Sequence, residues 1–277
     1  MNLPVLRYRK ELRLGKSHNI FITSDLHIGA IDFNEKGFHK VMSSIYDKCD
    51  KILILGDVFD AIFSKDKRYT PSVTSLAGID DQLNGAIDMA FNILKPYANK
   101  IQLISKGNHE VAILKYVNVD ILSMLIYRLN HETGSTIQMG SYRGYVQHVF
   151  TTANKNVRYY NLLYDHGHGG SSMVTKGMID INRIKTGMSF DGFFFGHKHN
   201  KIADIDNQIS LSRTGKILTK KRISAQVGTF KNLIFDSKTV GWEDTKGFDN
   251  PVNGGIMLTI TTKLQDSDYY LDQSITL

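Results

Sequence analysis

The feature that most constrains the fold of this sequence is a set of short apolar runs, each followed at once by a group of polar residues. Runs of four or five residues are long enough for a buried strand, and they are too short for most buried helices. We therefore predict four buried strands, over Asn19–Thr23, Lys51–Leu55, Ile101–Ser105 and Gly192–Phe195.

The segments around the first three runs carry apolar residues at helical spacing. They predict helices over Glu35–Cys49, Ser72–Ala98 and Glu110–Asn130. The resulting βαβαβα order favours a parallel sheet with right-handed crossover connections.

The pattern changes at about Ser141, where aromatic and β-branched residues become frequent. This change predicts a second sheet, mixed or antiparallel, and one further helix. We expect strands over Tyr145–Thr151, Val157–Tyr164, Ile217–Val227 and Gly255–Thr262, and a helix over Ser171–Lys185. No repeat or linker divides the chain, so residues 1–277 are expected to form a single domain.

Composition narrows the class of protein. No window approaches the 18 apolar residues of a membrane span, and the first fifteen residues carry too many charges for a signal-peptide core. Cys49 is the only cysteine, which excludes an internal disulfide framework and a Cys-based zinc site. We expect a cytoplasmic protein without a membrane partner. The net charge of +7 favours an anionic partner such as nucleic acid, although an ordinary solvated surface explains this excess equally well.

The polar groups that follow the strands are carboxylates, amides and imidazoles. In open α/β sheets, ligands bind beyond the carboxyl ends of the strands, so these groups are the candidate site. They fall in five stretches: Ser24–His27, Gly56–Asp60, Lys106–Glu110, Asp165–His168 and Gly196–His199. Six of the ten histidines lie inside these stretches, and we interpret the other four as structural or surface residues: His18, His39, His131 and His148.

Oxygen and nitrogen donors together suit manganese, iron, cobalt, nickel or zinc better than calcium or magnesium. The donors outnumber the needs of one ion, and the two oxygens of Asp57 allow it to bridge a pair of ions. Each motif alone has a simpler explanation, such as a helix cap or a turn. Their joint occurrence at successive strand ends favours a metal site.

The ordered series Asp25-x-His27, Gly56-Asp57, Gly107-Asn108-His109-Glu110, His166-Gly-His168 and Gly196-His197-x-His199 resembles the calcineurin-like metallophosphoesterase superfamily, over residues 19–200. The resemblance implies an α/β fold, a four-layer α/β/β/α sandwich with two mixed sheets and a dinuclear site between them. It implies two divalent ions, manganese first, with iron, zinc, nickel and cobalt as alternatives. It implies these ligands: Asp25, His27 and His199 for one ion, Asn108, His166 and His197 for the other, and Asp57 as the bridge.

The resemblance also implies that His109 contacts the scissile phosphate and protonates the leaving group, so that His109 and Asp57 are the candidate catalytic residues. Around the ligands, Asp60 and Glu110 are candidates for orienting imidazoles, with a helix-start role as the alternative for both. His168 is the alternative to His166 as a ligand, and otherwise a neighbour of the site. The following basic residues would flank the substrate path, unless they form a solvated hairpin: Lys198, Lys216, Lys220, Lys221 and Arg222.

Within the superfamily, Ser24–Gly29 and Gly56–Asp60 look closest to the nuclease subunits of double-strand-break repair complexes and to phage-encoded relatives. Lipid A pathway pyrophosphohydrolases share similar opening motifs but have Arg where this chain has His109. The leading hypothesis is a phosphodiesterase or nuclease acting on DNA or RNA. The alternatives are a phosphatase or phosphodiesterase for small nucleotides or phosphoproteins, and a non-catalytic metal-binding scaffold.

Overall fold

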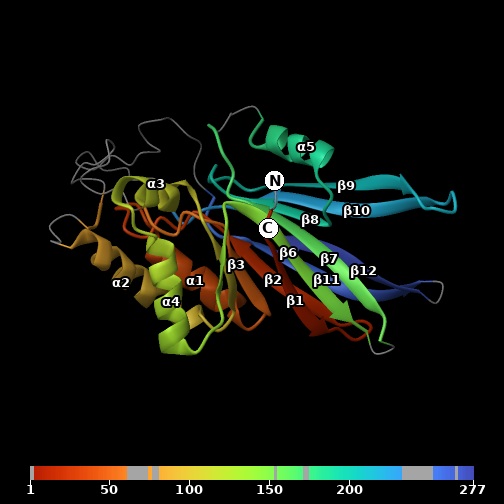
Figure 1. Cartoon of the computed structure of the whole chain (residues 1–277), viewed down its shortest axis with the longest axis horizontal. Coiled ribbons are helices and arrows are strands. Elements are labelled where there is room, and N and C mark those ends of the chain that lie inside the picture. Colours follow the sequence, from red (N-terminus) through yellow and green to blue (C-terminus); the bar gives the residue numbers. More distant parts are fainter. Residues whose placement is uncertain are drawn as a thin grey trace.

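Two six-stranded sheets stack face to face, and helices cover their outer faces (Figure 1). The computed structural model describes residues 3–60, 74–76, 81–152, 155–170, 175–232, 252–265 and 268–277. The predicted four-layer α/β/β/α sandwich is confirmed. None of the helices in these ranges is long and apolar enough to cross a membrane.

The first sheet carries the predicted βαβαβα unit. Its strands β2 to β5 are parallel, and two antiparallel strands from the end of the chain extend it. The order is β12 (Asp268–Thr276), β11 (Ile256–Gln265), β2 (Ser17–Thr23), β3 (Lys51–Ile54), β4 (Ile101–Ser105) and β5 (Gln138–Gly140).

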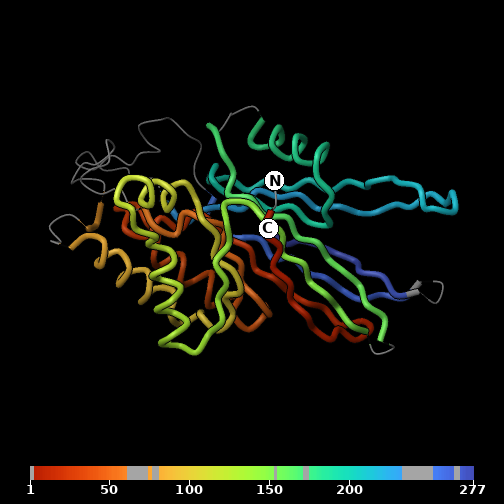
Figure 2. Tube along the Cα trace, in the orientation of Figure 1, coloured from red at the N-terminus to blue at the C-terminus, as the bar shows by residue number. Residues whose placement is uncertain are grey.

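The second sheet is also mixed. β7, β8 and β10 run parallel to one another, as do β1 and β6, whereas the β6–β7 and β9–β10 pairs are antiparallel. The order is β1 (Val5–Glu11), β6 (Arg143–Thr151), β7 (Val157–Asp165), β8 (Gly192–Phe195), β10 (Ile217–Gln226) and β9 (Ile202–Leu211). Figure 2 shows the β9–β10 hairpin reaching well beyond β8.

Alternation along the strands separates three apolar layers. In β2, Ile20 and Ile22 pack between the sheets, whereas Phe21 packs under the helices of the first sheet. That outer layer is covered by α1 (Glu35–Tyr46), α2 (Gln82–Leu94), α3 (Asn108–Val117) and α4 (Ile121–Thr133). On the other side, α5 (Met178–Gly187) buries Ile181 against β7 and β8. Because the central strands are buried on both faces, their sequences read as unbroken apolar runs.

The predicted helix over Glu110–Asn130 is wrong in one respect, since it is two helices. Asn118 adopts a left-handed conformation with φ 57° and ends α3, and Asp120 then caps α4 by accepting a hydrogen bond from the Ser123 amide at 3.2 Å. In the predicted helices over Ser72–Ala98 and Ser171–Lys185, residues 72–73, 77–80 and 171–174 lie outside the described residues. The described parts become helical at Gln82 and Met178, and 95–97 form a 3-10 turn.

His18 and His148 are buried between the sheets, and their ring centroids lie 5.4 Å apart. Burial, with a contribution from the Lys10 ammonium, lowers the pKa of His18 to about 4. Burial likewise lowers the pKa of His148 to about 3. Asp50, 3.2 Å from His18 Nδ1, opposes the shift without cancelling it.

Acid should therefore destabilise the fold. The unfolded chain binds protons at these histidines below about pH 6.5 and the folded chain does not, so stability falls as pH falls from 6.5 toward the folded pKa values. We expect each of these two histidines to make the unfolding free energy about 2 kcal/mol lower at pH 5 than at pH 8. Urea titrations at both pH values should show that the difference in unfolding free energy between pH 8 and pH 5 is smaller in His148→Phe by the contribution of His148. The exposed His131→Gln variant should keep the full difference, and an unchanged difference in His148→Phe would contradict this account.

Candidate metal centre

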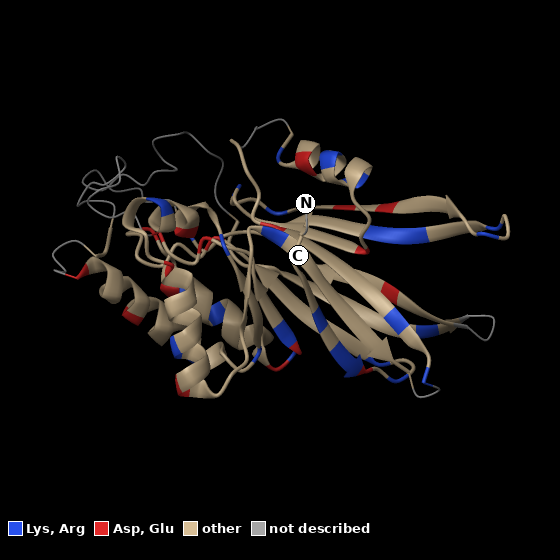
Figure 3. Cartoon of the chain, in the orientation of Figure 1, with Lys and Arg blue, Asp and Glu red and all other residues tan. Residues whose placement is uncertain are grey.

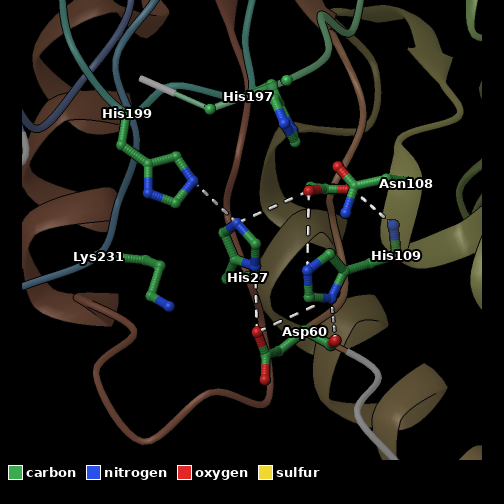
Figure 4. A pocket seen from close by; sticks show the side chains of 10 residues that line it. His27, Asp60, Asn108, His109, His197, His199 and Lys231 are labelled. Atoms are coloured by element: carbon green, nitrogen blue, oxygen red, sulfur yellow. Dashed lines mark hydrogen bonds and ion pairs between the residues drawn. The ribbon is translucent and has the colours of Figure 1, made fainter. Parts of the chain in front are cut away.

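The polar stretches that follow the strands meet at one end of the sandwich. They come from the carboxyl ends of β2, β3 and β4 in the first sheet and of β7 and β8 in the second. A cavity of about 340 Å³ opens there, and Figure 4 shows its side chains pointing toward one another. Its lining consists of His27, Asp57, Asp60, Asn108, His109, Gly169, Gly170, His197, His199 and Lys231.

The first donor cluster joins Asp25, His27 and His199. Nε2 of His199 lies 3.4 Å from Asp25 Oδ1 and 3.2 Å from Nε2 of His27, which is itself 3.8 Å from the same carboxylate oxygen. Two imidazole nitrogens and one carboxylate oxygen therefore point at a common centre. Asp25 Oδ1 is buried and accepts no hydrogen bond of good geometry from the described residues. A buried carboxylate oxygen whose nearest partners are the imidazole nitrogens of other candidate ligands fits a cation ligand.

The second donor cluster joins Asp57, His166 and His197. Nε2 of His166 lies 3.2 Å from Asp57 Oδ2 and 2.9 Å from Asn108 Oδ1. The rings of His166 and His197 pack edge to face with centroids 5.2 Å apart. These four side chains offer two oxygens and two nitrogens, a set that suits a borderline divalent ion.

Asp57 lies between the two clusters. Its Oδ2 is 3.8 Å from His27 Nε2 on one side and 3.2 Å from His166 Nε2 on the other, and a third donor cluster joins Asp57 to His27 and His109. The first cluster has the members of one ligand set that the resemblance implies; the second shares His166 and His197 with the other set and contains Asp57, while Asn108 contacts His166 beside it. The geometry thus allows one carboxylate to serve both centres, as in two-metal sites.

Backbone strain is concentrated at the donors. Eight described residues other than glycine have positive φ, a region that side chains disfavour. Five of them are candidate ligands: Asp25, His27, Asp57, His197 and His199. Such conformations cost free energy and persist where the surrounding structure holds them, often at functional sites.

Two of the glycines next to the ligands are required for space. A Cβ on Gly107 would lie 2.3 Å from the backbone nitrogen of Asp57, and a Cβ on Gly196 would lie 2.4 Å from Asp25 Oδ2. No side chain fits at either position without moving a candidate ligand, so the Gly-Asn-His and Gly-His motifs have a steric reason.

Two of the imidazoles are oriented as metal ligands usually are. His166 donates from Nδ1 to the Leu55 carbonyl at 2.8 Å, since a carbonyl can only accept. His27 places Nδ1 3.1 Å from Asp60 Oδ1. Both contacts leave Nε2 facing the donor cluster, and partners of this kind fix the tautomer and orientation of ligating histidines.

The electrostatics indicate an excess of negative charge at the centre. Burial alone would lower the pKa of His166, but the adjacent Asp57 carboxylate raises it to about 10. Burial would raise the pKa of Asp25, yet its contact with His199 and the neighbouring imidazole charges bring it down to about 2. Both carboxylates are therefore ionised, and the site favours added positive charge. The donor types, their convergence and their charge all fit divalent cations.

His109 stands beside the donors rather than among the outer clusters. Its backbone nitrogen donates to Asp57 Oδ1 at 2.9 Å, and its Nδ1 donates to the Asp60 carbonyl. Nε2 then faces the cavity, 4.0 Å from Asp57 Oδ2. This nitrogen is placed to exchange a proton with a bound molecule.

The three residues expected around the ligands have different positions. Asp60 contacts the His27 imidazole, in agreement with an orienting role. Glu110 contacts backbone rather than imidazole: it accepts hydrogen bonds from the amides of Gly107, Asp57 and Phe59 at 2.8 to 3.1 Å. Its carboxylate thus ties the β3 loop to the start of α3. His168 is exposed and belongs to none of the three donor clusters found in the described chain.

Glu110→Gln should disrupt this tie. Both oxygens of the Glu110 carboxylate accept hydrogen bonds, whereas a glutamine side chain has one accepting oxygen and would turn its NH2 group toward a backbone N–H. We expect a loss of about 2 kcal/mol of unfolding free energy, the usual cost of unsatisfied buried groups, together with weaker metal binding. Urea denaturation and manganese calorimetry would measure both. Glu35→Gln, on the exposed first turn of α1, is the control, and equal stability of the two variants would argue against the role.

Sequence reasoning missed Lys231, which no motif marks. It follows β10, is only 5% exposed, and lines the cavity beside His27 (Figure 4). Its Nζ lies 3.1 Å from Asp32 Oδ2. Burial lowers the pKa of His27 to about 4, and the Lys231 ammonium adds to this shift. Burial would raise the pKa of Asp60, but its contact with His27 and the nearby imidazole and Lys231 charges lower it to about 2. A buried cation therefore faces the site from the side opposite His109.

The basic residues that sequence reasoning placed near the substrate path are mostly engaged elsewhere. Figure 3 shows Lys and Arg spread over strands and helices rather than gathered at one place. Lys216 and Lys220 to Arg222 lie in the half of the hairpin away from the site, because β10 reaches the site with its carboxyl end. Four are ion-paired: Lys198 with Asp180, Lys220 with Asp191, Lys221 with Asp272 and Arg222 with Asp206.

Comparisons with known proteins give fold-level similarity only. No protein-family model and no curated protein sequence matches the chain. Among solved structures, the chain is similar to the calcineurin-like phosphoesterase YfkN from Bacillus subtilis, with 11% identity, a TM-score of 0.36, and coverage of 94% of this chain and 90% of that one. Vps29 from Chaetomium thermophilum has 11% identity and a TM-score of 0.36, with coverage of 93% of this chain and 97% of that one. GAP50 from Plasmodium has 10% identity and a TM-score of 0.42, with coverage of 88% of this chain and 81% of that one. Similarity at this level establishes no activity, ligand or partner.

Proposed function

We propose that this chain is a metallophosphoesterase that binds two divalent cations, manganese first, and hydrolyses phosphodiester bonds in DNA or RNA. The observation that carries the proposal is the meeting of two donor clusters at one shared carboxylate, Asp57, with the His109 imidazole over the same cavity. We assign Asp25, His27 and His199 to one ion, Asn108, His166 and His197 to the other, and Asp57 to both.

When bound, the pair of cations would lower the pKa of a water molecule and neutralise charge on the phosphate ester. The chain's own residues would then orient the substrate and move a proton. His109, carrying a proton on each ring nitrogen, would donate its Nε2 proton to the leaving oxygen and become neutral, while its Nδ1–H stays bonded to the Asp60 carbonyl and holds the ring for this step. Lys231 would attract the anionic substrate into the cavity.

A diester of a nucleic acid is favoured over a small phosphate ester by the net charge of +7 and by the motif resemblance to repair nucleases. The compact cavity of about 340 Å³ is the observation that favours a small nucleotide instead, because it lies at the low end of ligand-site volumes.

The test is a substrate panel with added manganese: bis(p-nitrophenyl) phosphate, p-nitrophenyl phosphate, labelled single- and double-stranded DNA, and small nucleotides. Cleavage of DNA that requires metal and weakens steeply with salt would support the nuclease. Cleavage of small nucleotides alone would favour the second candidate. Manganese binding without turnover of any substrate would support a scaffold and refute the proposal.

Lys231→Met should raise KM for an anionic substrate with a smaller change in kcat, since the charge acts mainly in binding. We expect about a tenfold rise, the equivalent of one charge-assisted contact. Steady-state kinetics would separate the two constants, and Lys198→Met is the matched control, because Lys198 is also ion-paired, with Asp180, but does not line the cavity. A fall in kcat at unchanged KM would contradict a binding role.

A further inference from the structure

We propose that two copies of this chain pair through the outer edge of β9, in an antiparallel arrangement about a two-fold axis. β9 is the last strand of the second sheet and runs for ten residues, and in the described chain no strand pairs with its outer edge. The pairing would join the second sheets of two copies into one continuous sheet. It does not rest on the proposed function.

The four sheet edges differ in how they are protected. Edge strands are commonly kept from pairing by charge, shortness or proline. β1 carries Arg7, Arg9 and Lys10, β5 has only three residues, and Leu271 and Ile275 of β12 pack against the core between the sheets rather than lying exposed. β9 contains no Lys, Arg or Pro.

The two acidic residues of β9 do not protect its edge. Asp204 forms an ion pair with Lys185 of α5, and Asp206 forms one with Arg222 of β10 at 2.6 Å. Both carboxylates therefore lie toward the α5 side of the sheet and are neutralised there. The edge is left without an unneutralised charge that would repel a second strand.

The opposite face of β9 is apolar and exposed. Ile205, Ile209 and Leu211 share one face of the strand and are 54%, 72% and 73% exposed. Ile223, which pairs with Ile205 on that face, is fully buried between the sheets. The apolar face thus continues from the core out along β9. Figure 1 shows β9 at the edge of its sheet, beside β10.

The residues with exposed apolar side chains are also the ones whose backbone N–H and C=O groups point away from β10. Ser212 donates its amide to the Lys216 carbonyl at 2.8 Å, so even-numbered residues of the hairpin strand point their backbone groups toward β10. The odd-numbered residues, from Ala203 to Leu211, direct theirs outward. A second strand would bond to the residues that carry the exposed apolar side chains.

One register is self-complementary. With the axis at Asn207, Ile205 of one copy faces Ile209 of the other, Ala203 faces Leu211, and Asn207 faces itself, so that the apolar side chains meet apolar partners. Moving the axis to residue 206 sets two aspartates opposite each other. Moving it to residue 208 sets Ile209 opposite Asn207. Of these three registers, the one with Asn207 at the axis pairs apolar with apolar side chains and opposes no two aspartates, and we take it as the register of an isologous dimer.

A pairing of this size is at the small end of specific interfaces, so we expect micromolar affinity. Sedimentation velocity of the full chain from about 1 to 100 µM should show a concentration-dependent dimer. Ile209→Lys, which places a charge on the edge, should be monomeric throughout. Tyr127→Lys, at a 71% exposed position on α4, should dimerise like the wild type.

Register is tested by cross-linking. In a hydrogen-bonded antiparallel pair the Cα atoms lie about 5.5 Å apart, within the reach of a short bis-maleimide cross-linker. Asn207→Cys should therefore give a covalent dimer with that reagent, whereas Ser210→Cys should not, because it would face Asp204 of the second copy and lie far from the second Ser210→Cys thiol. The native Cys49 is buried and does not compete. A monomer at every concentration, a dimer that survives Ile209→Lys, or equal cross-linking of both cysteine variants would each overturn the proposal.

Discussion

The Asp57→Asn variant is expected to fold normally and to lose metal-dependent hydrolysis. Asparagine keeps an oxygen that can accept the His109 amide hydrogen bond of 2.9 Å, so the local backbone should be retained. The charge that both donor clusters share is lost. Removing a neighbour that only orients a ligand costs 10- to 100-fold, so we expect the loss of the bridging carboxylate to reduce kcat/KM by about 10³-fold or more.

Metal binding should fall together with activity. Manganese calorimetry on the wild type should give two sites, and on Asp57→Asn at most one weak site. Asp50→Asn is the matched control, because Asp50 also accepts a backbone hydrogen bond, from Asn19 at 2.8 Å, at the other end of β2. If Asp57→Asn bound two ions with unchanged affinity, the assignment of Asp57 as the bridge would be wrong.

The buried strands were predictable because their environment is simple. Strands covered on both faces need apolar residues at every position, and the four runs follow that rule. β1, β5, β9 and β12 were missed: β5 has only three residues, and the other three are exposed along much of their length and alternate or mix polar residues. In β1, for example, Arg7, Arg9 and Lys10 hide the strand in a charged segment.

The break at Asn118 was missed because neither glycine nor proline marks it. Asparagine is one of the few other residues that adopt the left-handed conformation easily, so the same position reads as a helix interior or as its end. Helical periodicity continues across the break and gives no warning.

The candidate ligands could be predicted as a group because the topology brings strand ends together. Their detailed roles could not. The sequence does not show whether the Glu110 carboxylate contacts an imidazole or the backbone. That depends on the conformation of the turn from Gly56 to Phe59, whose amides it accepts from. Lys231 lies on a segment without a motif, and the ion pairs that neutralise Lys220 and Arg222 join residues from distant parts of the sequence.

The His109→Gln variant is expected to keep metal binding and to lose activity in proportion to the difficulty of the leaving group. Glutamine cannot transfer a proton at neutral pH, whereas the donor clusters on either side of Asp57 remain intact. For DNA, whose leaving alkoxide needs a proton, we expect kcat to fall by about 10²- to 10⁴-fold. For p-nitrophenyl esters, whose leaving group departs without one, the fall should be less than about tenfold.

The contrast between substrates separates proton transfer from metal binding. Removing a metal ligand should lower kcat on both substrates by the same factor and lower the bound manganese as well. His27→Gln, which removes a candidate ligand in the same cavity, is therefore the comparison variant. Parallel measurements of kcat on DNA and on bis(p-nitrophenyl) phosphate, with bound manganese determined in the same samples, give the result directly. Equal losses on the two substrates at full metal content would assign His109 to phosphate binding alone, and loss of metal would make it a ligand.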